Sequence, residues 1–434
     1  MSRARLLGGA IGVTVALLLA GCGDDGGGGG GDNAGGGGGG LEGTGEITLA
    51  TGKDTSGNMQ KIVDAWNAEH ADQKVRIVEL PESADGQRQQ MVQNAQVKSE
   101  AFSVLNLDVV WTAEFAANRW VVELPENEFE LDKYLEPAVS TAKYRDKLYA
   151  VPMFSDGGLL YYRKDLLDAA GVQPPKTWQE LTEACTKVKA LPQAANIGCY
   201  AGQFEKYEGL TVNFSEAVNS AGGEVVKDDG TPDVDTDQAK TGLDNLVNGF
   251  KDGTIPRQAI TYKEEEGRRA FQAGELLFHR QWPYQWALAN KNDGSSQVAG
   301  KFDVAPLPGV DGPGASTLGG HNFAISAFAK NKKTALEFIK FFGNDENQRS
   351  NLLATSQAPT RAGLYDDEEL VKQFPYLPTL KESILSAKQR PSVVKYGDVT
   401  TAIQEAAYAA LTGEMSSDEA LADLQGKLEE LTKQ

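Results

Sequence analysis

The sequence predicts an α/β protein of two lobes, each built from a mixed sheet wrapped by helices. The chain has 434 residues, which is long enough for two domains of ordinary size. Strand-like and helix-like segments alternate over residues 47–111, as they do in parallel sheets covered by helices. Residues 148–167 then join two strand-like runs through paired glycines, which is typical of a connection between lobes.

The first lobe is expected to begin with a β-α-β-α-β unit. Segments with the period of a strand alternate with segments with the period of a helix, at residues 47–51, 59–66, 74–80, 87–99 and 104–111. In such sheets ligands bind beyond the carboxyl ends of the strands. Asp108 lies near the end of the third strand-like segment. Its carboxylate is therefore expected either to contact a ligand or to cap the helix that follows.

The glycine-containing stretch at residues 148–167 is predicted to divide the chain between the two lobes. An apolar run ends at Pro152, which cannot donate to a strand ladder, and a second β-rich run follows at residues 159–162. Gly157-Gly158 lies between these runs, and Asp156 is the single acid at the joint. We interpret the stretch as a crossing between lobes; the alternative is an ordinary loop within one domain. A second glycine-containing strand, at residues 318–325, is a candidate for the return crossing.

The later part of the chain is predicted to be mainly helical. Capping boxes at Thr177 and Ser416 each place a Glu three residues after a hydroxyl residue, which marks a helix start. Apolar residues recur at helical spacing in the segments 178–188, 237–250, 335–342 and 417–431, and further helices are expected at 207–222 and, as a charged helix, at 264–271.

The N-terminus is predicted to be an export signal and a linker rather than part of the folded protein. Residues 1–21 combine two arginines, a short apolar run and small residues before Cys22, which is the pattern of a secretory signal. The apolar run is too short for a membrane-spanning helix. Cys22 after Leu-Ala-Gly is similar to a bacterial lipobox and predicts a lipid anchor; the alternative is an unlipidated cleaved signal with a chance cysteine. Residues 22–45 are dense in glycine and predict a flexible tether.

The charge of the chain limits its partners. The net charge is −19, and removing residues 1–21, which contain two arginines and no acids, makes it −21. Such an acidic surface repels nucleic acid and anionic membranes, so no nucleic-acid partner is expected. Attachment to the extracytoplasmic face of the cell membrane would then depend on the lipid at Cys22.

Two further cysteines are predicted to form a disulfide. Cys185 and Cys199 are the pair that remains in an exported chain, and such pairs are often bridged. The alternative is a buried free thiol on a helix face.

No catalytic or metal-binding constellation is visible in the sequence. The three histidines, His70, His279 and His321, are not spaced as metal ligands, and no phosphate loop, dinucleotide fingerprint or nucleophile elbow is present. We therefore expect a binding protein without metal or cofactor rather than an enzyme. Scattered carboxylates always permit a glycosidase pair, so a secreted glycoside hydrolase is one alternative, and a structural surface lipoprotein is another.

The polar and aromatic residues fit a neutral sugar. Sugar hydroxyls both donate and accept hydrogen bonds, so carboxylates and arginines serve as partners, and sugar rings stack on aromatic side chains. The block from Trp282 to Trp286 is the densest aromatic segment. One of these two tryptophans is equally compatible with core packing.

Several segments together resemble a known family. The stretches LYAVPMFSDGGLLYYRKDLL, WQEL, KYEGL, FHRQWPYQW, VAPLP with TLGGHNFAIS, and RPSVVKYGDVTTAIQ occur in one order along nearly the whole folded chain. They are similar to the family 1 extracellular solute-binding proteins of ABC importers, and most similar to the trehalose/maltose-binding lipoproteins.

The resemblance implies an architecture and partners. It implies a type II periplasmic-binding-protein fold with a hinge of several strands, and a monomer that delivers a small oligosaccharide, such as a trehalose- or maltose-like α-glucoside, to an ABC permease. The expected divisions are a signal at 1–21, a linker at 22–45, a first lobe at 46–156 plus 321–365, and a second lobe at 157–320 plus 366–434.

The resemblance also implies ligand-binding residues, position by position. The residues at the corresponding positions are Arg88, Asp108, Asp156, Tyr207, Glu208, Trp282, Gly320, His321 and Arg390. Two positions depart from the branch, because Phe154 replaces a frequent tyrosine and His321 replaces a frequent tryptophan. A further polar contact is expected within residues 53–58. These departures leave three alternatives open for the ligand: trehalose or maltose itself, a different small α-glucoside, or a sugar with a polar aglycone.

Overall fold

A computed structural model of the protein describes residues 40–54, 56–227 and 229–433. The predicted signal, the predicted lipidation site Cys22 and most of the predicted linker lie outside these residues. Among the described residues, no helix has the length and apolarity needed to cross a membrane.

The first sheet has five strands and contains the predicted β-α-β-α-β unit. Its strands lie in the order β2 (Val75–Glu79), β1 (Ile47–Thr51), β3 (Val104–Asp108), β11 (Gly319–Ile325) and β6 (Ala150–Asp156). β1 pairs in parallel with β2 and β3, whereas β11 is antiparallel to β3 and β6. β3 is buried along its whole length, whereas the edge strand β2 is mostly half-buried or exposed. The predicted third strand extended to residue 111, but β3 ends at Asp108 because the chain turns there into a helix.

The second sheet has four strands in the order β10 (Asp303–Ala305), β7 (Leu159–Tyr162), β9 (Leu276–Gln281) and β8 (Gly198–Ala201). β7 is antiparallel to both neighbours, and β8 is parallel to β9. A short hairpin, β4 (Lys143–Tyr144) with β5 (Lys147–Leu148), lies outside both sheets.

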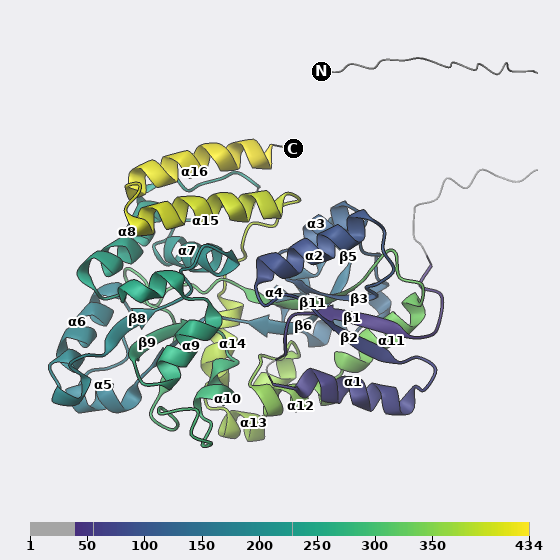
Figure 1. The fold of residues 1–434 in the computed structure, drawn as a ribbon, viewed down its shortest axis with the longest axis horizontal. Coiled ribbons are helices and arrows are strands. Elements are labelled where there is room, and N and C mark those ends of the chain that lie inside the picture. Colours follow the sequence, from purple (N-terminus) through teal and green to yellow (C-terminus); the bar gives the residue numbers. More distant parts are fainter. Residues whose placement is uncertain (1–39, 55, 228, 434) are drawn as a thin grey trace, which may run out of the picture. The chain divides into compact units, whose positions relative to one another are not determined.

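Helices cover both sheets (Figure 1). Those of the first part are α1 (Asn58–Glu69), α2 (Ala84–Gln96), α3 (Thr112–Ala117), α4 (Glu136–Thr141), α5 (Lys164–Ala170), α6 (Trp178–Lys189), α7 (Glu208–Ser220) and α8 (Asp237–Asp252). Those of the later part are α9 (Glu264–Gln272), α10 (Gln285–Ala289), α11 (Lys332–Phe342), α12 (Asp345–Thr355), α13 (Glu368–Gln373), α14 (Leu377–Leu385), α15 (Tyr396–Thr412) and α16 (Ser417–Thr432). The two C-terminal helices pack on each other and on α7 and α8.

Each sheet has its own hydrophobic core, which makes the protein two-lobed. The first core contains β1, β3 and β11 residues such as Leu49, Leu107 and Phe323. The second contains β9 and α7 residues such as Phe278 and Phe214. Full burial of such a side chain contributes about 1.5–3 kcal/mol, so each core stabilises the sheet that it covers.

The chain crosses between the sheets where the sequence suggested. β6 ends at Asp156 in the first sheet and β7 begins at Leu159 in the second, which excludes a loop within one sheet. Gly157-Gly158 is needed for close packing rather than for a left-handed backbone, since added Cβ atoms would lie 2.6 Å from Ser383 Oγ and 2.7 Å from Glu216 Oε1. The chain returns between β10 and β11. There Gly320 has φ 118° and packs against the Phe154 carbonyl, where a Cβ would clash.

The predicted caps and cysteine pair can be placed as well. Ser416 and Glu419 form the full capping box of α16. Thr177 caps α6 through the Glu180 N–H, but the Glu180 carboxylate accepts from the Lys176 N–H instead of completing a box. Cys185 of α6 and Cys199 of β8 are joined in a disulfide, with Cα atoms 5.7 Å apart.

Candidate ligand-binding site

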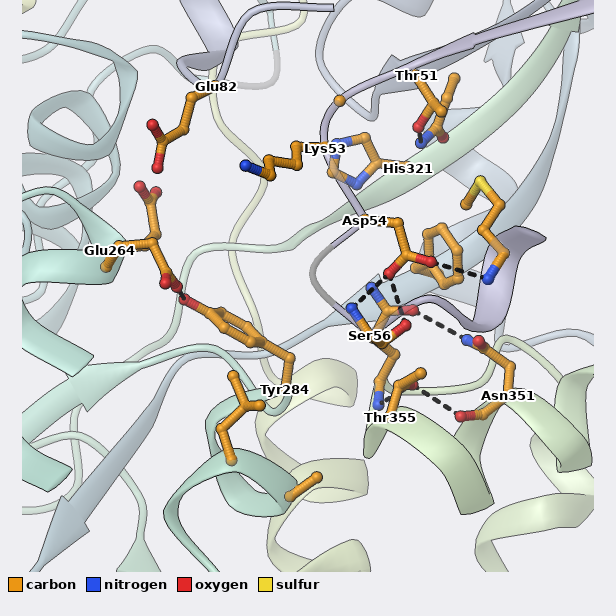
Figure 2. Close-up of a pocket in the computed structure, with 18 of the residues that line it drawn as sticks. Thr51, Lys53, Asp54, Ser56, Glu82, Glu264, Tyr284, His321, Asn351 and Thr355 are labelled. Carbon is orange, nitrogen blue, oxygen red and sulfur yellow. Dashed lines mark hydrogen bonds between the residues drawn. The ribbon is translucent and has the colours of Figure 1, made fainter. Parts of the chain in front are cut away.

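A cavity of about 370 Å³ lies between residues of the two lobes (Figure 2). The first lobe contributes the carboxyl ends of β1 and β3, the following loop, and parts of β6, β11 and α12. The second contributes the start of α9 and residues of and around α10. The lining includes Thr51, Lys53, Asp54, Ser56, Glu82, Asn106, Phe154, Lys263, Glu264, Tyr284, His321, Asn351, Thr355 and Gln357.

The loop after β1 is ordered by Asp54. Its carboxylate accepts hydrogen bonds from the N–H of Ser56 at 2.8 Å and of Met59 at 2.9 Å, and also from the Ser56 hydroxyl. Because the first N–H groups of a helix lack partners within the helix, this acid stabilises the start of α1. Lys53, Asp54 and Ser56 line the cavity, within the segment for which the sequence left the contact residue open.

Aromatic rings face the cavity from both lobes. Figure 2 shows Tyr284 and Glu264 on one side and His321, Asp54 and Asn351 on the other. The Tyr284 hydroxyl donates to Glu265 Oε1 at 2.9 Å, and Glu265 is itself paired with Arg268, which fixes the ring. Phe154 and His321 meet edge to face at 6.3 Å. Burial lowers the pKa of His321, against the effect of nearby Asp108, so the imidazole is neutral at neutral pH.

Three of the predicted ligand-binding residues form what we call the cross-lobe cluster: Asp108, Glu208 and Arg390. Arg390 Nη2 lies 2.7 Å from Asp108 Oδ1, and Arg390 Nη1 lies 2.5 Å from Glu208 Oε1. Tyr396 and Thr400 also donate to Glu208. Asp108 ends β3 of the first sheet, whereas Glu208 begins α7 of the second core, so the cluster joins the lobes. Burial raises the pKa of Glu208 to about 7, although Arg390 opposes the shift.

Asp108 does not cap α3, whose N-cap is Trp111 without a side-chain hydrogen bond, and the contact of Asp108 with a ligand stays a prediction. Asp108 Oδ1 accepts from the Val110 N–H at 3.2 Å in the turn before α3, while the same carboxylate pairs with Arg390.

Trp282 and Asp156 lie beside a second arginine cluster. Arg280 pairs with Glu216 through Nη2–Oε1 at 2.5 Å and Nε–Oε2 at 2.7 Å, and its Nη1 donates to Gln203. We call Arg280, Glu216 and Gln203 the second-lobe cluster. The Arg280 guanidinium stacks on Trp282, 3.8 Å from the ring centroid. Burial raises the pKa of Asp156 to about 7, against the opposing charge of Arg280.

The remaining predicted residues lie close to these clusters. Arg88 of α2 forms a bidentate pair with Glu114 of α3, at 2.8 and 2.5 Å. With Glu208 it borders a separate hollow of about 270 Å³. Tyr207 is buried, and its hydroxyl has no hydrogen-bond partner among the described residues. Gly320 lies in β11, directly before His321.

Of the predicted ligand-binding residues, His321 lines the 370 Å³ cavity, and the others lie in or beside the clusters around it. Their contact with a ligand stays a prediction. The sequence reasoning missed Asn106, Tyr284 and Asn351. Asn106 could have been found, because it lies two positions before Asp108 and strand residues two apart share a face. Tyr284 belongs to the aromatic block, whereas α12 carries no signal that would single out Asn351.

Two lobes with a polar, aromatic-lined cavity between them define a ligand-binding protein. The family model of the bacterial extracellular solute-binding proteins matches residues 51–349, and the chain belongs to this family. The family consists of binding proteins, not enzymes.

Individual relatives agree with this assignment. A probable ABC transporter-binding protein of Deinococcus radiodurans is 34% identical over 378 residues, covering 85% of this chain and 89% of the relative. The maltose-bound structure of MalE3 from T. maritima superposes with a TM-score of 0.84 at 34% identity, covering 89% of this chain and 99% of that one. A mannitol-binding protein of Pseudomonas aeruginosa is 24% identical, covering 88% of this chain and 92% of the relative.

Proposed function

We propose that the protein is the extracytoplasmic binding component of an ABC importer that captures a small neutral sugar, of the maltose or trehalose type, and delivers it to the permease. The observation that carries this proposal is the cavity lined from both lobes by amides, hydroxyls, aromatic rings and charged side chains of both signs. Hydroxyl-rich ligands need such mixed donors and acceptors, and their rings need apolar planes. The likeness to an ABC transporter-binding protein and to a maltose-bound structure supports the same class.

The cavity also accounts for how binding would change the protein. A ligand shifts an equilibrium between open and closed lobes only through contacts that it makes in the closed state. Tyr284 and Lys263 reach the cavity from the second lobe, and His321 and Asp54 from the first. A sugar that contacts both sets therefore favours closure, with the lobe divisions at 46–156 plus 321–365 and 157–320 plus 366–434.

Calorimetry tests the proposed ligand class. Purified protein lacking residues 1–21 is titrated with maltose, trehalose and D-mannitol, the last because a relative carries that name. We expect saturable binding of at least one, with a smaller radius of gyration by X-ray scattering. The proposal would be contradicted if the protein bound none of the three ligands, or if it converted a bound sugar into products.

We also propose that Cys22 carries a lipid that holds the protein at the membrane as a monomer. The sequence Leu-Ala-Gly-Cys and the glycine-dense segment after it support this. Replacing Cys22 by Ala should release the protein from the membrane fraction, since a lipid chain supplies the apolar area for attachment. A Cys22→Ala protein that stays with membranes after high-salt and carbonate washes would disprove the anchor.

A further inference from the structure

Two asparagine side chains line the first-lobe wall of the cavity, and they differ in how their amides are used. Asn351 of α12 is satisfied within the protein, because its Oδ1 accepts from Asn58 at 2.9 Å and its Nδ2 donates to Gln357 at 2.9 Å. Asn106 of β3 donates from Nδ2 to Thr51 Oγ1 at 2.9 Å, but its Oδ1 has no partner among the described residues.

The position of Asn106 makes its unpaired oxygen informative. The residue is only 6% exposed and lies near the carboxyl end of β3, between β1 and β11. Leaving a buried acceptor unpaired costs about 1–3 kcal/mol, so such atoms are rare in native proteins unless something else satisfies them. The carboxyl ends of parallel strands β1 and β3 are also where ligands bind in sheets of this kind.

The lining residues beside Asn106 restrict the chemistry of a partner. Thr51 on β1, Phe154 on β6 and His321 on β11 carry no charge at neutral pH, whereas the charged lining residues of the first lobe, Lys53, Asp54 and Glu82, belong to the loops that follow β1 and β2. Because the Thr51 hydroxyl can donate or accept, either the oxygen or the NH₂ of the Asn106 amide can be the end that Thr51 leaves unpaired. A hydroxyl matches both orientations, whereas a carboxylate matches only the NH₂ and an ammonium only the oxygen.

We propose that Asn106, held by Thr51, binds one hydroxyl group of a neutral sugar or polyol and thereby selects among ligands of the same size. This specificity role rests on the proposed sugar-binding function and adds a residue that the family resemblance does not supply. Asn351, with both amide ends engaged, shapes the wall without selecting a hydroxyl.

Singly deoxygenated ligands test the pairing of one hydroxyl with Asn106. Wild type and Asn106→Leu, which keeps a similar shape without polar atoms, are titrated with the tightest binder among maltose, trehalose and D-mannitol, and with each of its monodeoxy analogues. We expect Asn106→Leu to weaken the parent ligand about tenfold. One monodeoxy analogue should bind wild type about tenfold more weakly than the parent ligand does. The same analogue and the parent ligand should bind Asn106→Leu with equal affinity.

Asn106→Ala serves as a second variant, and unliganded unfolding temperatures show that the proteins compared are folded. Asn351→Ala is the matched control, because its effect should be equal for all analogues. If Asn106→Leu and Asn106→Ala weaken every analogue by the same factor, or leave the parent affinity unchanged, the subsite is disproved while sugar binding stands. If wild type binds none of the three parent ligands, the proposed function fails and the subsite with it.

Discussion

The two buried arginine clusters use the same chemistry in different places. In the second-lobe cluster, Arg280, Glu216 and Gln203 all belong to one lobe, and every nitrogen of the guanidinium has a protein partner. In the cross-lobe cluster, Arg390 joins Asp108 of one lobe to Glu208 of the other, and its Nε has no partner among the described residues. The location of the partners therefore decides whether an ion pair stabilises a lobe or the arrangement of two lobes.

Breaking the second-lobe cluster should have the largest effect. Arg280→Met leaves Glu216 as an uncompensated buried carboxylate, which we expect to lower the free energy of unfolding by about 3–5 kcal/mol. Urea denaturation measures the loss. The control is Arg349→Met, which removes a partly exposed pair with Asp367 and should cost under about 1 kcal/mol. Equal losses in the two variants would contradict the distinction.

Breaking the cross-lobe cluster should lower the free energy of unfolding by less, but it should change the arrangement of the two lobes more. In Arg390→Met, Asp108 and Glu208 can regain water if the lobes separate, so we expect a loss of about 1–3 kcal/mol. The unliganded variant should also have a larger radius of gyration by X-ray scattering, which Arg280→Met should not show. An unchanged radius in Arg390→Met would mean that the cluster does not hold the lobes together.

Two buried carboxyls should make the stability depend on pH: Asp156 beside the second-lobe cluster and Glu208 in the cross-lobe cluster. The folded-state pKa of Asp156 is about 7, against 3.8 for an unperturbed aspartate, so folding takes up a proton between these values. The free energy of unfolding should therefore fall as pH rises from about 4 to 7, by up to about 1.4 kcal/mol per pH unit for one proton. Glu208, with a raised pKa of about 7, adds a fall with the same sign. Asp156→Asn and Glu208→Gln should each flatten part of this slope, measured by denaturation at a series of pH values. A slope that neither variant changes would contradict the assignment.

The smallest expected change comes from a single hydroxyl in the cross-lobe cluster. Tyr396→Phe removes one donor to Glu208 while Arg390 and Thr400 remain. We expect a loss of about 1 kcal/mol in unfolding free energy. Because the lost bond favours the ionised carboxylate, the pH dependence assigned to Glu208 should move to higher pH. A shift to lower pH would show that Tyr396 does not stabilise the charged form.

The sequence predicted local structure better than long-range pairing. Hydrophobic periodicity located β1, α1, β2, α2 and β3, since period and burial are linked within each segment. The crossing between the two sheets was predicted because Pro152 marks the end of one strand-like run and Gly157-Gly158 precede the next. The position of β11 between β3 and β6 could not be predicted. The local sequence of a strand does not indicate which strand more than a hundred residues away will pair with it.

The candidate site shows the same limit at the level of side chains. Asp108 was placed correctly near a strand end, but its pairing with Arg390 depends on a contact between residues 282 positions apart. Asn106 and Asn351 have the same side chain, and only their neighbours in space distinguish a satisfied amide from one with a free end. The residue type determines which hydrogen bonds a side chain can form. The position of its neighbours in space determines which of these bonds are formed within the protein.

The central position of β11 also determines when the first lobe can fold during synthesis. Its partners β3 and β6 are complete by Asp156, yet β11 does not begin until Gly319, after the whole second sheet has been made. Until then the facing edges of β3 and β6 present unpaired backbone groups, which can pair wrongly with other chains. The first sheet of this protein is therefore completed only after all strands of the second sheet have been made. A chain that stops before Gly319 would retain every strand of the second sheet but would leave the first open at its centre.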